Sequence, residues 1–201
     1  MKDLSFVVKG ILAGILIGMG GYIYLTVGGV AGAVLFAFGL ISVITLGLNL
    51  FTGKAQFVWS SSAPAQMEQG GYLWIIAILL LNLVGCWIMG ALGSNPALNE
   101  AAQTIITRRL ALPLWKAGAL AIGCGIIMTM AVQSANKGKW LPLLFGIPAF
   151  ILCGLPHCIA DAFYIAALPG EFFVANLAPI ASFYLAIVAG NFLGCNAYRL
   201  L

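Results

Sequence analysis

Residues 153–161 read Cys153-Gly-Leu-Pro-His-Cys-Ile-Ala-Asp161, and they lie at the end of a run without acidic or basic side chains that begins at Trp140. A membrane-spanning helix needs about 20 apolar residues in succession, and this run provides them. Pro156 lacks a backbone N–H and clashes with the preceding turn, so the helix is predicted to break here. A break at membrane depth is tolerated only where protein or water satisfies the freed backbone groups. The stretch therefore predicts an interrupted membrane helix around the chain's one histidine, His157.

The rest of the chain has the same apolar character. Of its 201 residues 63% are hydrophobic and 7% are charged, and the mean hydropathy is +1.09. Such a composition cannot cover a soluble surface with polar groups, which excludes a soluble catalytic domain. The formal charge of +4 is spread over the ends of the apolar runs and forms no patch for nucleic acid. No catalytic acid pair, activated nucleophile or metal-ligand motif is visible, so we expect neither an enzyme nor a cofactor.

Turn residues and charges divide the chain into six predicted crossings, which gives an all-α integral membrane protein. The crossings cover residues 5–27, 31–58, 72–93, 110–135, 141–168 and 177–199. An even number places both termini on one side, together with five basic residues, while three others lie opposite. These are Lys2, Lys9, Lys137, Lys139 and Arg199 against Arg108, Arg109 and Lys116. The positive-inside rule then makes both termini cytoplasmic.

An internal repeat indicates how the six helices are arranged. Residues 82–86, Asn-Leu-Val-Gly-Cys, reappear as Asn-Phe-Leu-Gly-Cys at 191–195, and glycines 14, 18 and 20 are matched with glycines 118, 123 and 125. We predict one channel domain over 1–201 with halves of approximately 1–105 and 106–201. Because each half has three crossings, the second half is inverted relative to the first, and such repeats enclose a permeation route between broken helices. Chance similarity of glycine-rich helices is the alternative.

The second crossing contains a break that corresponds to the one in the fifth. It includes Asn49-Leu-Phe-Thr-Gly-Lys54, in which Thr52 precedes His157 by the same interval that relates the glycine clusters. The half-helix ends at both breaks point at a common centre and carry partial positive charge, which suits an anion. An ionisable residue at this depth is a functional candidate, and a histidine there can exchange a proton with a weak acid. A purely structural His157, and a Thr52 that bonds back to its own helix, are the alternatives.

Lys54 and Asp161 form an unusual pair, because each follows the break of its own half. An isolated charge there is costly, so one hypothesis is that the two side chains neutralise each other. The other is that Lys54 lines the mouth of the pathway and attracts anions.

On these residues the chain resembles the formate/nitrite transporter family of pentameric anion channels, from residues 9–14 through 190–194. Leu50-Phe-Thr-Gly53 resembles the family's loop in its second helix, and the segment around His157 is similar to its Gly-x-Glu-His-x-x-Ala-Asn motif. The resemblance implies an aquaporin-like 3+3 fold with one pore per protomer in a homopentamer. It also implies a prokaryotic inner or plasma membrane, with lipid and a small anion as the other partners and no cofactor.

The resemblance also implies roles for single residues. His157 is the central histidine, Thr52 faces it, Asn191 contacts the pore, and Arg109 attracts anions at the outer start of the fourth crossing. An outer constriction is formed by Leu50, Phe51 and Met128, and a cytoplasmic one by Phe36, Leu40 and Phe150. The chain departs from the family pattern at Pro156, where a glutamate is usual, at Asp161 and Gly125, where asparagines are usual, and at Lys54.

These features predict a channel for small monovalent weak-acid anions, with formate or nitrite as the first candidates. A bare anion is costly between apolar constrictions, so it is expected to pass His157 as the neutral acid. Alternatives on the same fold are hydrosulfide, acetate or lactate as cargo, or a neutral solute such as water or glycerol. A membrane scaffold without transport is a further alternative, but it gives the broken helices no purpose.

Overall fold

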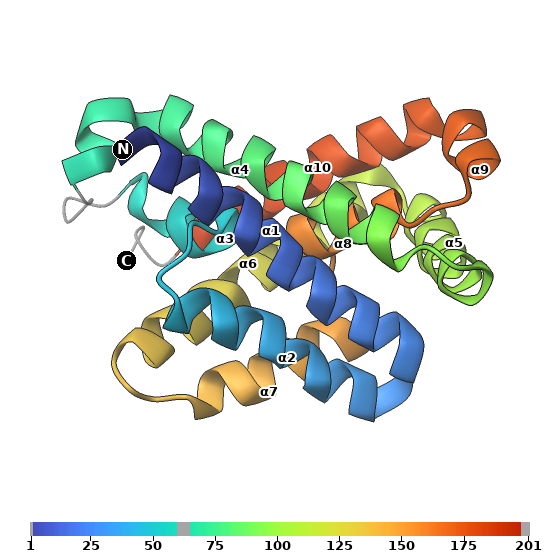
Figure 1. The fold of residues 1–201 in the computed structure, drawn as a ribbon, viewed down its shortest axis with the longest axis horizontal. Helices are drawn as coiled ribbons and strands as arrows, with labels where there is room; N and C mark the ends of the chain where they lie inside the picture. Colours follow the sequence, from blue (N-terminus) through green and yellow to red (C-terminus); the bar gives the residue numbers. More distant parts are fainter. Residues whose placement is uncertain (1, 60–64, 198–201) are drawn as a thin grey trace.

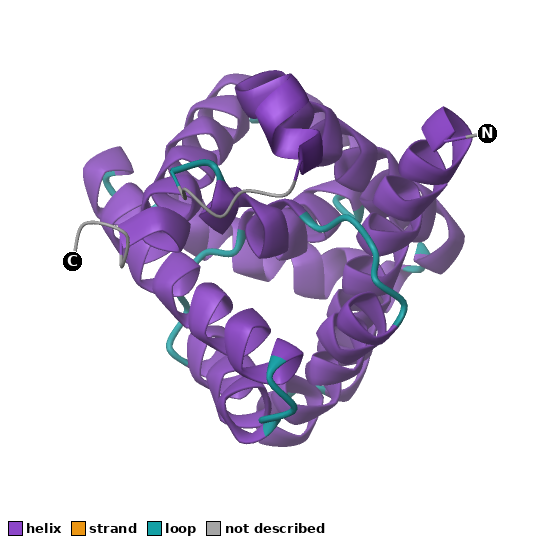
Figure 2. Ribbon diagram, turned by 90° about the vertical axis from the view of Figure 1, so that its left-hand side faces the viewer, coloured by secondary structure: helices purple, strands orange, loops and turns teal. Residues whose placement is uncertain are grey.

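The computed structural model describes residues 2–59 and 65–197, and within these ranges the chain consists of helices and short connections without any strand (Figures 1 and 2). The helices are α1 (Lys2–Val27), α2 (Gly29–Thr45), α3 (Phe51–Lys54), η1 (Ala55–Phe57), α4 (Ala65–Gly93), α5 (Pro96–Leu110), α6 (Leu114–Asn136), α7 (Leu141–Leu152), α8 (Cys158–Ala166), α9 (Gly170–Ala175) and α10 (Leu177–Asn196).

Four of these helices contain segments long and apolar enough to cross a membrane. The segments are Leu4–Val27, Gly71–Gly93, Leu114–Asn136 and Leu177–Asn196, and they match four of the six predicted crossings. The other two predicted crossings are occupied by α2 and α7, which are shorter apolar helices followed by α3 and α8. The count of six crossings therefore stays a prediction.

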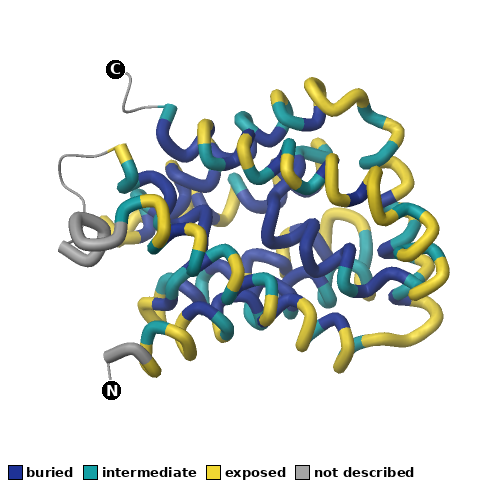
Figure 3. The backbone as a smooth tube through the Cα atoms, turned by 90° about the horizontal axis from the view of Figure 1, so that it is seen from above, coloured by how far each residue is buried: buried dark blue, intermediate teal, exposed yellow. Residues whose placement is uncertain are grey.

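The long helices pack in two groups with the same internal contacts. In the first group α1 contacts α2 and α4, and in the second α6 contacts α7 and α10. The beginning of α1 and the loop between α6 and α7 lie at one end of the molecule, and α5 and α9 lie at the opposite end (Figure 1). The buried residues run through the middle, with exposed residues around them (Figure 3).

Glycines let the helices of each group approach backbone to backbone. A Cβ atom on Gly14 of α1 would overlap the carbonyl of Asn82 in α4, and one on Gly125 of α6 would overlap the carbonyl of Asn191 in α10. The structural counterpart of Gly14 is thus Gly125. The sequence match of Gly14 with Gly118 was wrong, because spacing alone does not tell which glycine faces the neighbouring helix.

The two short apolar helices end in similar turns. Residues 46–50 separate α2 from α3, and residues 153–157 separate α7 from α8. Each connection contains a glycine with positive φ, 61° at Gly47 and 68° at Gly154, a conformation that other residues adopt only with strain. Both connections lead into a short helix that begins in the interior.

An asparagine from a long helix holds each connection in place. The side chain of Asn82 accepts a hydrogen bond from Phe51 N at 2.8 Å and donates to the carbonyls of Gly10 and Asn49. The side chain of Asn191 accepts from Cys158 N at 2.7 Å and donates to the carbonyls of Ala121 and Pro156. Buried backbone groups that have no helical partner in these connections are paired in this way.

Candidate functional site

A buried hydrogen bond joins the two short helices at the centre of the molecule. Thr52 Oγ1 lies 3.0 Å from His157 Nε2, and the two residues are 0% and 1% exposed. Thr52 comes from α3, and His157 is the residue that caps the N-terminus of α8. The pairing of Thr52 with His157 that the sequence predicts is therefore present as a direct contact.

The other ring nitrogen of His157 fixes the tautomer. His157 Nδ1 accepts a hydrogen bond from Ala160 N at 3.1 Å, so this nitrogen carries no proton. A neutral imidazole then has its proton on Nε2, which donates it to Thr52 Oγ1. The hydroxyl hydrogen of Thr52 is left for another acceptor.

Aromatic rings cover one side of the imidazole. The ring of Phe150 stacks on His157 with a centroid distance of 5.5 Å, and Phe36 packs edge-on against Phe150 at 6.0 Å. Both phenylalanines are buried. The polar pair thus has an apolar wall beside it.

An ion pair supports the backbone next to His157. Arg109 Nε of α5 lies 3.1 Å from Asp161 Oδ1 of α8, and the two side chains are 12% and 1% exposed. The second carboxylate oxygen accepts from His157 N at 2.8 Å, and Arg109 Nη1 donates to the carbonyl of Gly154. The pair therefore connects α5 with the beginning of α8 and with the turn after α7.

This ion pair corrects the hypothesis that Asp161 neutralises Lys54. Asp161 has Arg109 as its partner, whereas Lys54 lines a different cavity and makes no ion pair with any described side chain. In the sequence, Lys54 and Asp161 each follow one of the two predicted breaks. Nothing in the sequence indicated that α5 brings Arg109 next to Asp161 of α8.

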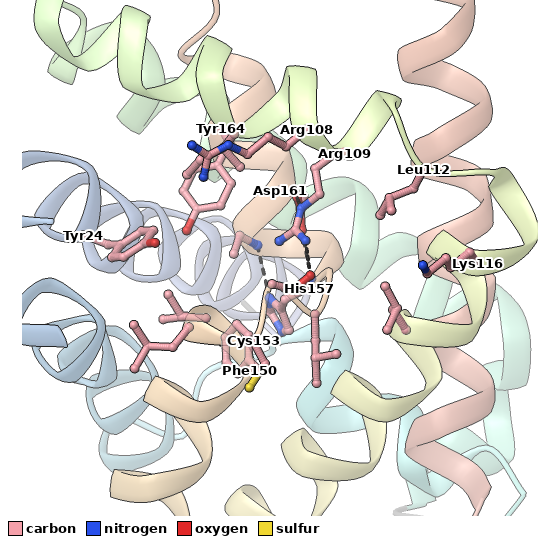
Figure 4. Close-up of a pocket in the computed structure, with 17 residues that line it drawn as sticks. Tyr24, Arg108, Arg109, Leu112, Lys116, Phe150, Cys153, His157, Asp161 and Tyr164 are labelled. Atoms are coloured by element: carbon pink, nitrogen blue, oxygen red, sulfur yellow. Dashed lines mark hydrogen bonds and ion pairs between the residues drawn. The ribbon is translucent and has the colours of Figure 1, made fainter. Parts of the chain in front are cut away.

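A cavity of about 390 Å³ lies between α5 and the connection from α7 to α8, and we call it the α5-side cavity (Figure 4). His157, Arg109, Asp161 and Phe150 line it, as does Tyr164. It contains the ring of His157 at its inner end and basic side chains from α5 and α6 at its rim. Titratable and cationic groups from distant segments of the chain thus meet in one space.

A second cavity, of about 170 Å³, lies toward the end of the molecule where α1 begins, and we call it the terminus-side cavity. It is lined by Leu40, Leu50 and Lys54, and by Gly53 next to Thr52. The Thr52–His157 pair consequently lies between the two cavities, with His157 facing the larger one and the neighbours of Thr52 lining the smaller.

The cavities show that the predicted grouping of the constrictions was wrong. Leu40 and Leu50 were expected on opposite sides but line the same cavity, and Phe150 was expected opposite Arg109 but shares a cavity with it. Residues one helical turn apart on α2 lie at different depths: Leu40 lines the terminus-side cavity, whereas Phe36 packs against Phe150 of the α5-side cavity.

The remaining predicted site residues are buried without lining either cavity. Met128 is 1% exposed, and the backbone of Phe51 is held by Asn82. Asn191 uses its whole amide on backbone groups, as described above, so it acts on the site by positioning α8.

Sequence reasoning missed Tyr24 and Tyr164 of the α5-side cavity, and Asn82. Asn82 could have been found, because the repeat pairs it with Asn191. The tyrosines carried no signal, since aromatic residues in apolar helices are usually interpreted as packing or interface anchors.

Comparison with known sequences and structures identifies proteins that are similar to this chain. A sequence profile described as Formate/nitrite transporter matches residues 1–198. An uncharacterized transporter of Bacillus subtilis (strain 168), YrhG, is 29% identical over 170 residues, which cover 74% of this chain and 63% of that protein. The match thus spans less than two thirds of that relative.

Two solved structures have the same fold. One is described as a pentameric formate channel with formate bound, with a TM-score of 0.75 and 23% identity over 98% of this chain and 94% of that one. The other is described as an FNT family ion channel, with a TM-score of 0.76 and 23% identity over 98% of this chain and 87% of that one. The apolar helices and the profile match make this an integral membrane protein, and the chain belongs to the formate/nitrite transporter family.

Proposed function

We propose that the protein is a channel for small monovalent weak-acid anions, with formate or nitrite as the cargo, and that the anion crosses the centre as its neutral acid. The observation that carries the proposal is the Thr52–His157 pair, a buried polar contact between two cavities. Desolvating an ion beside apolar side chains such as Phe36 and Leu50 is costly, whereas a neutral acid needs only one or two hydrogen bonds.

The fold supports an arrangement of six crossings. In this arrangement α2 with α3, and α7 with α8, each form one interrupted crossing, and residues 1–105 and 106–201 are inverted halves. The matching roles of Asn82 and Asn191 support the two halves. By similarity to the pentameric neighbour, five chains form a homopentamer in a prokaryotic inner membrane, and the basic residues favour cytoplasmic termini.

The hydrogen bonds of His157 bear on the source of the proton. A second proton on the imidazole would have to go onto Nδ1, which faces the N–H of Ala160, so two hydrogens would meet. The Nε2 proton cannot leave a neutral ring without forming an imidazolate. We therefore propose that the proton comes from the bulk solution and reaches the anion through water in the α5-side cavity. In this proposal Thr52 and His157 supply the polar contact that holds the acid as it passes.

Basic side chains at both ends support an anion as the cargo. Lys54 lines the terminus-side cavity, and Arg108 and Lys116 line the α5-side cavity. Such charges raise the local concentration of anions by long-range attraction.

Uptake into proteoliposomes with an imposed pH gradient tests the proposal. Formate influx should increase as the outside is acidified, glycerol should not enter, and replacing His157 with Phe should remove most of the formate flux. Uptake of hydrosulfide, acetate and lactate, each measured on its own, identifies the cargo among these anions. Glycerol or water flux without formate flux would show that the chain is a neutral-solute channel instead.

A further inference from the structure

Two tyrosines of the α5-side cavity have hydroxyl groups that no part of the described chain uses. Tyr164 of α8 is 3% exposed and Tyr24 of α1 is half-buried, and their ring centroids lie 6.5 Å apart. Both line the cavity, and neither hydroxyl has a hydrogen-bond partner among the described residues. Figure 4 shows the two hydroxyl groups directed toward each other across one part of the cavity. Hydroxyls of this kind are normally hydrogen-bonded, so they point to a ligand or water at this place.

The cavity also carries positive charge that no acidic side chain of the described chain compensates. Arg109 is compensated by Asp161, whereas Arg108 and Lys116 make no ion pair within the described part of the chain. Arg108 and Tyr164 both line the cavity, and in the view of Figure 4 the side chain of Arg108 extends toward Tyr164. The lining of the cavity therefore offers an anion two uncompensated cationic side chains and two phenol donors in addition to His157.

We propose that Arg108, Tyr24 and Tyr164 form a second binding site, which holds a monocarboxylate in the α5-side cavity before it reaches the Thr52–His157 pair. A bound carboxylate accepts hydrogen bonds from two phenol O–H groups and one guanidinium, donors that suit this anion. The inference rests on the proposed function, because it names the class of anion that the same pathway receives.

The size of the cavity makes this site less selective than the centre. About 390 Å³ holds an acetate or a lactate together with water, so these anions bind there as formate does. Discrimination between these anions then takes place at the centre, at the buried aromatic rings and the Thr52–His157 pair. Lactate is accordingly expected to inhibit formate uptake competitively through this site.

The test is the concentration dependence of formate uptake by Tyr164→Phe and Arg108→Gln channels in proteoliposomes. Each change should raise the half-saturating formate concentration about tenfold, as expected for one lost hydrogen bond to a charged group, while the maximal rate falls less than twofold. The inhibitory constant of lactate should rise by a similar factor. The matched controls are Tyr72→Phe and Lys137→Gln, at exposed positions outside the cavity, and these should behave as the wild type.

Titration calorimetry of formate and lactate with the purified wild-type channel and its Tyr164→Phe variant separates the two proposals. A wild type without formate flux refutes the proposed function, yet binding that Tyr164→Phe abolishes would still support the site. If the wild type conducts formate, and Tyr164→Phe has the same half-saturating formate concentration and the same lactate inhibition as the wild type, the second binding site is refuted and the proposed function stands. Equal binding by both proteins, or no binding by either, also overturns it.

Discussion

At the scale of single residues, the structure determines what His157 can do through the atoms that surround it. Ala160 N donates a hydrogen bond to Nδ1 of His157, and Nε2 is hydrogen-bonded to Thr52 Oγ1, so both ring nitrogens have partners within the protein. A histidine that had to gain and lose a proton in each cycle would need one nitrogen open to the cargo. Here the outward donor of the pair is the hydroxyl of Thr52, and the histidine orients it.

This role gives Thr52 a specific prediction. Thr52→Val keeps the shape of the side chain and removes the hydroxyl, so Nε2 of His157 loses its acceptor. We expect formate flux to fall at least about tenfold, which corresponds to about 1.4 kcal/mol of lost interaction with the passing acid. Thr52→Ser restores the hydroxyl and should retain most of the flux, as measured by initial uptake rates in proteoliposomes. Equal losses in the valine and serine variants would show that the hydroxyl alone does not account for the role of Thr52.

At the scale of elements, the start of α8 is held by two other helices. Asn191 of α10 binds the backbone on both sides of His157, and Arg109 of α5 binds Asp161 and the carbonyl of Gly154. These contacts replace the backbone pairing that a continuous helix would provide across the connection from α7 to α8. The position of the imidazole therefore depends on α5, a helix that lies outside the long apolar segments.

A double-mutant cycle tests the connection between α5 and α8. Removing one partner of a buried ion pair leaves the other charge uncompensated, so Arg109→Gln or Asp161→Asn alone should destabilise the folded channel, by about 3–5 kcal/mol at most. The double variant should recover part of the loss, with a coupling energy between about 0.5 and 3 kcal/mol. In a second cycle, the destabilisations caused by Lys54→Gln and Asp161→Asn should simply add. Lys54 and Asp161 line different cavities, and Asp161 pairs with Arg109. Thermal unfolding in detergent measures both cycles, and coupling found only in the Lys54 cycle would contradict the structure.

The contact between α1 and α4 gives a prediction for the glycines. A Cβ atom on Gly85 would overlap the carbonyl of Ile11, so Gly85→Ala must push the helices apart. Overpacking of this kind costs about 1–3 kcal/mol, and it should lower the melting temperature. Gly170→Ala is the control, since a Cβ atom there meets nothing within 4 Å. If the two variants have the same melting temperature, the close approach of α1 and α4 does not contribute to stability.

At the scale of the whole molecule, hydropathy and the internal repeat predicted the positions of the long helices better than they predicted the geometry of the site. Long apolar runs determine where spanning helices lie, and Asn82 and Asn191 indicated two related halves before any contact was known. The contact of Thr52 with His157 followed from the same repeat. The partner of Asp161 and the cavities that Leu40 and Phe150 line could not be predicted, because they depend on where α5 lies relative to α8 and on the directions of α2 and α7. Such long-range placement has no local sequence signal.

The position of both cavities within one chain leads to a prediction for the assembled protein. Both cavities and the Thr52–His157 pair are built from residues of a single chain, so each subunit of the proposed pentamer should conduct on its own. Mixing wild-type and His157→Phe subunits in equal amounts should then leave about half of the formate flux, whereas one pore shared by five subunits would keep about 3% if every subunit were needed. Flux is measured in proteoliposomes against the subunit ratio, with native mass spectrometry confirming that the subunits mix within pentamers. A linear dependence is expected, and a steep one would mean that the conducting path lies between the chains.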